Sequence, residues 1–290
     1  MTPFDRVVLI YNPAHAGIPP HLASMLDRDI AERLPGLQVE HHPTEFAGHA
    51  RELARVLAAN GRPLLVSVSG DGGYHEVVNG LMEAGPTDAV CAVMAAGNAN
   101  DHRRSTGRLP VIDAIERADV HRIDLLRLTI GGSRTVYAHS YVGFGLTPRM
   151  AIAIEEGTKG TLTELLSIGR SLSALKPFEI SRADGAHALF DSLVFANISH
   201  MAKYGKVSES AHPDDGLFEV ITLPHAGKWR IALMTFRAVT IGLGDQPSVS
   251  RYAFTTTDPI PCQADGEVIM VQANTSILVE SVPRALAVIS

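Results

Sequence analysis

The chain has 290 residues, 46% hydrophobic and 19% charged, which is enough apolar material for one large or two medium domains with packed cores. The 31 acidic residues outnumber the 25 basic residues, and the net charge of −6 argues against a protein that coats nucleic acid. Cys91 and Cys262 form neither a CxxC pair nor a disulfide framework. No apolar run approaches the roughly 20 residues that cross a bilayer, and the first ten residues lack the pattern of a secretory signal. We therefore expect a cytoplasmic protein without a membrane span.

The first 123 residues predict alternating strands and helices. Short apolar runs predict strands at residues 7–11, 38–42, 64–68 and 90–95. Helical spacing of apolar residues predicts helices at 21–34, 48–59 and 74–84. Buried strands that alternate with helices indicate a parallel sheet covered on both faces, in which ligands bind at the carboxyl ends of the strands.

The pattern changes near Ile123, after which short β-rich runs dominate. They occupy residues 125–130, 135–140, 178–182, 192–198, 216–223, 268–271 and 276–282. Two helical insertions are expected at 162–175 and 228–242. We predict a doubly wound α/β domain over 1–123 and a mostly antiparallel domain over 124–290, with the alternative that the last strand returns to the first domain.

A glycine-rich turn, Ser69-Gly70-Asp71-Gly72-Gly73, follows the predicted strand at 64–68 and precedes a helix. Glycines let backbone N–H groups approach an anion, and the helix N-terminus adds partial positive charge, so this turn suits a phosphate. Asp71 would repel a phosphate unless a cation lies between them, which implies Mg²⁺. The alternative is a tight turn whose glycines serve only packing. His75-Glu76 lacks the second histidine of a zinc protease.

The run 69–81 resembles the GDGT-x-x-E-V-x-N-G-L signature of the diacylglycerol kinase catalytic-domain family, which includes sphingosine kinases and bacterial lipid kinases. Five further segments resemble other family motifs in the same order along the chain. They are Asn12-Pro13 through Gly17, Thr44 through Ala54, Ala96 through Asp101, Pro213 through Leu217, and Asp265-Gly266-Glu267. The resemblance therefore extends from residue 12 to residue 267.

The resemblance implies an ATP- and Mg²⁺-dependent lipid kinase with an α/β nucleotide domain, a β-sandwich lipid domain and an active site between them. The residues it implies for nucleotide binding are Asn12, Thr44, Gly70, Asp71, Gly72, Gly73, Glu76, Asn98 and Asp101. Glu267 would accept the proton of the lipid hydroxyl, and Asp71 would organise Mg²⁺ or phosphate contacts. Asp215 would hold a second, structural Mg²⁺ with His212 and Leu217.

Plainer interpretations stay open for these residues. Asp215 and Glu267 also suit hairpin turns, and Asn100-Asp101 also suits the N-terminal cap of a helix. The family usually has Thr after GDG, so Gly73 removes a hydroxyl that would contact phosphate. A catalytically weak regulator that binds nucleotide or lipid therefore remains an alternative. A small-molecule kinase similar to NAD kinase, which shares a GDG turn, remains another. The expected partner is a lipid met transiently on the inner face of the membrane, with a homodimer through an edge strand as a further option.

Overall fold

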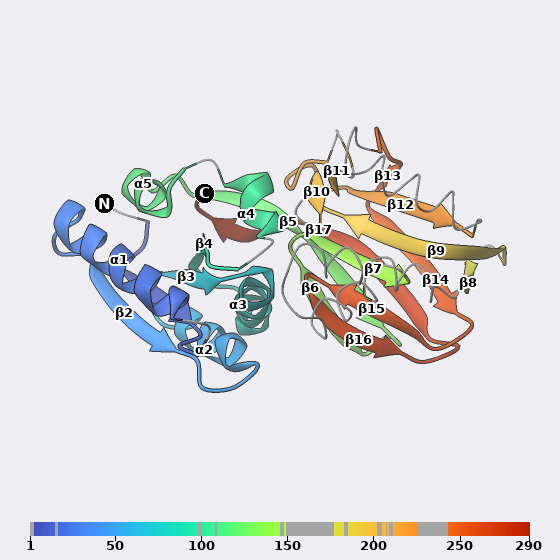
Figure 1. The fold of residues 1–290 in the computed structure, drawn as a ribbon, viewed down its shortest axis with the longest axis horizontal. Helices are drawn as coiled ribbons and strands as arrows, with labels where there is room; N and C mark the ends of the chain where they lie inside the picture. Colours follow the sequence, from blue (N-terminus) through green and yellow to red (C-terminus); the bar gives the residue numbers. More distant parts are fainter. Residues whose placement is uncertain are drawn as a thin grey trace. The chain divides into compact units, whose positions relative to one another are not determined.

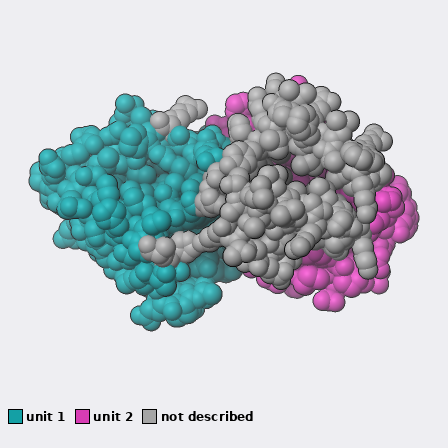
Figure 2. All heavy atoms as spheres, viewed as in Figure 1, with its two compact units in different colours: residues 1–124, 283–290 teal, residues 125–282 magenta. Residues whose placement is uncertain are grey.

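In the computed structural model the chain divides into two compact units. The structure describes residues 3–14, 17–97, 100–107, 109–145, 148, 177–182, 185–201, 205–206, 208, 211–225 and 243–290. Unit 1 comprises Met1–Asp124 and Pro283–Ser290, and unit 2 comprises Leu125–Val282 (Figure 2). The sequence placed the boundary after residue 123; the contacts place it after Asp124 and assign the last eight residues to unit 1. No helix among the described residues is long and apolar enough to cross a membrane.

Unit 1 is built on a parallel sheet with the strand order β2-β1-β3-β4. Its elements are β1 (Arg6–Tyr11), α1 (Ile18–Arg33), β2 (Gln38–Pro43), α2 (His49–Ala58), β3 (Pro63–Ser69), α3 (Asp71–Ala84), β4 (Val90–Ala95), α4 (Asp101–Thr106) and α5 (Val111–Arg117) (Figure 1). The end of β17 (Ser276–Val288) joins this sheet, where Val288 pairs in parallel with Cys91.

The central strands β1 and β3 of unit 1 are buried on both faces because helices cover each face of the sheet. Val7 and Leu9 of β1 pack with Leu26 and Ile30 of α1 and with Ile115 of α5. Successive strand residues point to opposite faces, so the intervening residues of β1 face the side covered by α2 and α3. The predicted doubly wound α/β arrangement is confirmed.

Helices α2 and α3 pack closely at Gly80, where α3 has no side chain. A Cβ atom at Gly80 would lie 2.2 Å from the carbonyl oxygen of Arg51 and 2.8 Å from the Cβ of Ala54. The Oε1 of Glu76 accepts a hydrogen bond from the N–H of Gly48, the residue that precedes α2, at 3.2 Å. Glu76 and Gly80 of the GDG-containing motif therefore hold α3 against α2.

Unit 2 contains antiparallel strands whose described buried residues form one large and one small hydrophobic cluster. They are β5 (His121–Ile130, which begins in unit 1), β6 (Arg134–Ala138), β7 (Tyr141–Gly145), β8 (Phe178–Arg182), β9 (His187–Ala196), β10 (His200–Met201), β11 (Gly205–Lys206), β12 (Phe218–Pro224), β13 (Ser248–Val249), β14 (Arg251–Thr256), β15 (Ile260–Ala264), β16 (Glu267–Val271) and the first part of β17. Strand β9 pairs with β12, with β8 and with β7. The large cluster contains a group of aromatic rings: Phe195 contacts Phe144, Phe218 and Phe254 with ring centroids 5.7–6.5 Å apart.

Several elements differ from the sequence prediction. Helix α3 begins at Asp71 rather than near residue 74, so Gly72 and Gly73 belong to its first turn. Helix α5 and strands β7, β14 and β15 were not predicted. Helix α4 was anticipated only through the alternative that Asn100-Asp101 caps a helix, and Asn100 does occupy the N-cap position of α4. The helices predicted at 162–175 and 228–242 lie outside the described residues.

Candidate functional site

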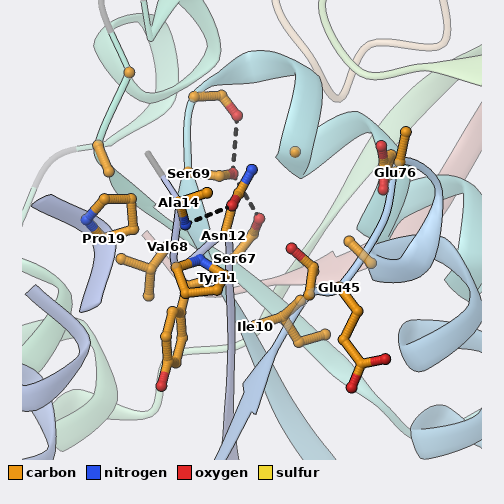
Figure 3. Close-up of a pocket in the computed structure, with 18 of the residues that line it drawn as sticks. Ile10, Tyr11, Asn12, Ala14, Pro19, Glu45, Ser67, Val68, Ser69 and Glu76 are labelled. Atoms are coloured by element: carbon orange, nitrogen blue, oxygen red, sulfur yellow. Dashed lines mark hydrogen bonds between the residues drawn. The ribbon is translucent and has the colours of Figure 1, made fainter. Parts of the chain in front are cut away.

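A cavity of about 840 Å³ opens in unit 1 where β1 and β3 end (Figure 3). This volume lies within the range of about 300–1,000 Å³ typical of small-molecule sites. Five of the residues implied for nucleotide binding line it: Asn12, Thr44, Gly70, Gly73 and Glu76. They come from three separate segments of the chain, and parallel strands bring such segments to one edge of a sheet.

The segments after β1 and β2 are fixed to one another by backbone contacts. The N–H of Thr44 donates to the carbonyl oxygen of Tyr11 at 2.8 Å. The Oδ1 of Asn12 accepts a hydrogen bond from the N–H of Ala14 at 2.9 Å, which shapes the turn after β1 (Figure 3). Asn12 and Thr44 therefore border the cavity from two strands whose ends are held together.

The turns after β3 and β4 meet at two glycines. A Cβ atom at Gly97 would lie 2.5 Å from the Cα of Gly70, closer than Cβ atoms tolerate. The N–H of Ala96 donates to the carbonyl oxygen of Ser69 at 2.9 Å, which fixes the approach. Both glycines line the cavity, so the chain uses them there for close backbone packing as well as for access to a ligand.

The N-terminus of α3 supplies the donors expected for an anion. The N–H of Tyr74 makes a helical hydrogen bond to the carbonyl oxygen of Gly70 at 3.1 Å. The N–H groups of the preceding first-turn residues have no acceptor within the helix, because such acceptors would lie before its start. Gly73 is one of these residues and lines the cavity, so its backbone is suited to meet a phosphate there.

The carboxylate of Asp71 contacts the start of α4, which the sequence did not predict. Its Oδ2 accepts a hydrogen bond from the N–H of Asp101 at 3.1 Å, and its Oδ1 accepts one from the N–H of His102 at 3.3 Å. The carboxylate therefore caps the N-terminus of α4, where negative charge is favourable. Asp71 does not line the cavity, and its role toward Mg²⁺ stays a prediction.

The remaining predicted residues of unit 1 lie around this cap. Asn100 occupies the N-cap position of α4, and its side chain accepts from the N–H of Gly97 at 3.1 Å and donates to its carbonyl oxygen at 2.8 Å. Asp101 is the first residue of α4 and is buried. Gly72 and Asp101 do not line the cavity, and Asn98 lies outside the described residues.

Two residues that line the cavity had no role in the sequence prediction. Phe46, which is 54% exposed, stacks on His49 with ring centroids 4.5 Å apart and offers a flat apolar surface. Ser69 places a hydroxyl at the end of β3 (Figure 3). An aromatic residue between Thr44 and His49 was the available signal for the first, and the serine before GDG for the second.

Glu267 is the first residue of β16 in unit 2. Its side chain is 39% exposed, and its Oε1 lies 3.6 Å from Nη2 of Arg134. The preceding turn is anchored by Asp265, whose buried carboxylate accepts hydrogen bonds from the N–H groups of His139 (2.7 Å), Ser140 and Tyr141 (both 2.9 Å). Asp265 therefore positions Glu267, a role that the sequence prediction did not assign.

The residues predicted to hold a second metal ion lie in an exposed loop of unit 2. The Oδ1 of Asp215 accepts a hydrogen bond from the N–H of Leu217 at 2.8 Å, which makes a local turn. Among the residues that the structure describes, no group of three or more His, Cys, Asp or Glu could hold a metal ion. The assignment of Asp215, His212 and Leu217 to Mg²⁺ therefore stays a prediction.

Glu219 is a buried acid beside this loop that the sequence prediction missed. Burial raises the pKa of Glu219, and the charge of Asp215 raises it further. A hydrogen bond from Ser248 and the charge of His212 oppose this shift. The ionised form of Glu219 is therefore unfavourable in the folded state of unit 2.

Comparison with known proteins finds a family that is similar to the part of the chain that forms this cavity. Residues 6–128 match the family described as diacylglycerol kinase catalytic domain. This part of the chain is therefore similar to the catalytic domain of that family. The match includes every residue that lines the cavity, and it confirms the resemblance drawn from the motifs.

Relatives of the kinase family extend the similarity beyond this domain. The chain is 26% identical over 280 residues to a diacylglycerol kinase of Bacillus subtilis (strain 168), covering 90% of this chain and 89% of that protein. It is 26% identical over 238 residues to a diacylglycerol kinase of Staphylococcus saprophyticus, covering 76% of this chain and 73% of that protein. A crystal structure of a diacylglycerol kinase from Bacillus anthracis has the same fold, with a TM-score of 0.74 at 19% identity over 100% of this chain and 98% of that one.

Proposed function

We propose that the protein transfers the γ-phosphate of ATP to a hydroxyl group of a diacylglycerol-like or sphingoid-like lipid. The observation that carries the proposal is the cavity of unit 1, which motif residues from after β1, β2 and β3 line together. The family that residues 6–128 match is named for the catalytic domain of diacylglycerol kinase. The lipid would be met at the inner surface of the membrane by a protein that otherwise stays in the cytoplasm.

The proposed division of labour follows from what phosphoryl transfer requires. The reaction needs alignment and charge neutralisation more than covalent catalysis. The first turn of α3 would bind the phosphates through backbone N–H groups, and Asn12 and Thr44 would hold the rest of the nucleotide at the cavity wall. Glu267 would accept the proton of the attacking hydroxyl.

Mg²⁺ would neutralise the phosphate charge, which is the contribution that a divalent ion makes in such reactions. A nucleotide-bound Mg²⁺ usually needs only one or two protein carboxylates, with water and phosphate oxygens completing its shell. Asp71 lies beside the glycine turn and its carboxylate has lone pairs beyond the two used to cap α4. Asp71 and the glycine turn therefore suit a Mg²⁺ ion that the protein shares with the nucleotide phosphates better than one that is bound by protein ligands alone.

The test is lipid phosphorylation by purified protein with radiolabelled ATP, Mg²⁺ and mixed vesicles that contain diacylglycerol or sphingosine. We expect a labelled lipid product that disappears when EDTA removes the metal. Parallel reactions with NAD in place of lipid distinguish the small-molecule kinase. A protein that neither binds ATP nor labels any lipid would refute the proposal.

Glu267→Gln tests the proposed base. We expect turnover to fall by about 10²–10⁴-fold, with ATP affinity unchanged, because the amide cannot accept the proton. Glu179→Gln is a matched control: Glu179 lies on β8 of the same unit, and its side chain is 44% exposed against 39% for Glu267. Equal turnover in both variants would remove Glu267 from the mechanism without affecting the proposed function.

A further inference from the structure

Two serine hydroxyls lie together at the end of β3, on the wall of the cavity. The Oγ atoms of Ser67 and Ser69 are 2.7 Å apart, and the Oγ of Ser69 donates to the carbonyl oxygen of Gly70 at 2.9 Å (Figure 3). Each hydroxyl has one proton, so Ser67 is the donor in the contact between the two serines. Ser67 therefore leaves the proton of Ser69 available to a second acceptor.

The side chain of Ser69 occupies the space that a side chain at position 73 would need. A Cβ atom at Gly73 would lie 2.6 Å from both the Cβ and the Oγ of Ser69. Contacts this short do not occur between real side chains, so positions 69 and 73 cannot both carry one in this geometry. Here the side chain is at 69, and position 73 is glycine.

This exchange explains the departure of Gly73 from the resembled signature, which has Thr at that place. The hydroxyl is present in the same space, but it comes from the strand before the turn instead of from the helix after it. In the structure it donates to a backbone carbonyl, a neutral acceptor. A phosphate oxygen is the stronger acceptor because it carries negative charge.

We propose that Ser69 supplies the side-chain hydroxyl that contacts a phosphate group of the nucleotide, with Ser67 orienting it. The inference rests on the proposed function, since it needs a nucleotide in the cavity of unit 1. It makes the serine before GDG a binding residue and removes Gly73 as a reason to expect a weak enzyme.

The test measures nucleotide binding by calorimetry, independently of turnover. Ser69→Ala is expected to weaken ATP binding by about 10- to 100-fold, the effect of losing a hydrogen bond to a charged group. Adenosine, which has no phosphate, should bind wild type and variant equally. Ser24→Ala is the matched control, because Ser24 on α1 has a hydroxyl that bonds only locally to the carbonyl of Pro20 and does not line the cavity.

A second set of variants moves the hydroxyl between the two positions. Gly73→Thr alone should weaken ATP binding, because the new side chain meets Ser69. Ser69→Gly with Gly73→Thr removes that clash and should bind ATP at least tenfold more tightly than Ser69→Gly alone. A double variant that binds ATP no more tightly than Ser69→Gly alone would count against a phosphate contact by a hydroxyl in this space.

The outcomes separate the inference from the proposed function. If wild type binds ATP and Ser69→Ala binds it equally well, the inference is overturned and the proposed function stands. Equal losses for ATP and adenosine also overturn it, because they mean a distorted turn. If wild type binds no nucleotide, the proposed function fails and the inference fails with it.

Discussion

The two units bring their polar residues together in different ways. In unit 1, aliphatic strands run in parallel and end at one cavity, whose wall includes Asn12, Thr44 and Gly73. In unit 2, antiparallel strands pack around a core that includes several phenylalanines. The candidate residue Asp215 lies in an exposed loop, and Glu267 is the first residue of β16, with its side chain 39% exposed.

Sheet topology accounts for this difference. Parallel strands have all their carboxyl ends at one edge, so motif residues that follow successive strands converge without further design. Antiparallel strands end alternately at opposite edges, so residues in their turns do not converge by topology alone. The candidate site of unit 1 can therefore be located from the fold of that unit alone. The proposed roles of Asp215 and Glu267 in unit 2 depend on the family resemblance and on experiment.

The largest expected effect concerns the helix pair that supports the cavity. Gly80→Ala would place a Cβ atom 2.2 Å from the carbonyl oxygen of Arg51, so α2 and α3 must separate. Overpacking of this kind costs about 1–3 kcal/mol, and more where backbone must move. We expect a clear fall in the melting temperature measured by circular dichroism, with unit 1 as the part that is lost.

The matched control for this variant lies on the same helix. A Cβ atom at Gly72 would meet nothing within 4 Å, and Ala has a higher helix propensity than Gly. Gly72→Ala should therefore melt at or above the wild-type temperature. Equal destabilisation by both variants would mean that α2 and α3 are not packed as described.

The sequence predicted unit 1 better than unit 2 for a physical reason. Strands β1, β3 and β4 are continuous apolar runs buried on both faces, and such runs are easy to recognise. The start of α3 was placed too late because two glycines suggest a turn, although the first turn of a helix tolerates them. In unit 2, β15 contains Pro261 and Gln263 and shows little alternation, so it was missed.

The sequence predicted the site residues that belong to recognisable motifs. It did not predict the contacts that depend on how two residues lie in space. The glycine turn, Asn12 and Thr44 were recognisable as motif residues, and the structure places them on one cavity. The cap that Asp71 provides to α4 joins residues thirty positions apart. The competition between Ser69 and Gly73 depends on a distance that no spacing in the sequence expresses.

Each unit contains one cysteine, so the rate at which a thiol reagent labels that cysteine measures the opening of that unit. Cys91 of β4 and Cys262 of β15 are both fully buried. Burial raises the pKa of Cys91 to about 12, and it also raises the pKa of Cys262. Since the thiolate is the reactive form, we expect both to react with a thiol reagent at pH 8 on the order of 100-fold more slowly than in unfolded protein.

Combining this measurement with Gly80→Ala sharpens the comparison of the units. In that variant Cys91 should label faster because unit 1 opens, while Cys262 keeps its wild-type rate. Mass spectrometry of the labelled peptides separates the two sites. Equal acceleration at both cysteines would show that the units open together and that their stabilities cannot be compared one by one.

The smallest expected effect concerns the buried acid of unit 2. The pKa of Glu219 is raised above the ordinary value of 4.5, chiefly by burial, so the folded state holds its proton more tightly than the unfolded chain does. Stability contributed at this residue is therefore greatest below about pH 4.5 and is lost as the pH rises through the folded-state pKa. Glu219→Gln removes the charge but keeps the size of the side chain.

We expect Glu219→Gln to raise the melting temperature by on the order of 2 °C at pH 7.5, and to leave it unchanged near pH 4, where the wild-type carboxyl is already protonated. The amide oxygen can still accept the hydrogen bond from Ser248, so packing and partner are retained. A gain of the same size at both pH values would assign the effect to packing. A loss at pH 7.5 would mean that the ionised carboxylate stabilises unit 2, which is the opposite of a charge buried at a cost.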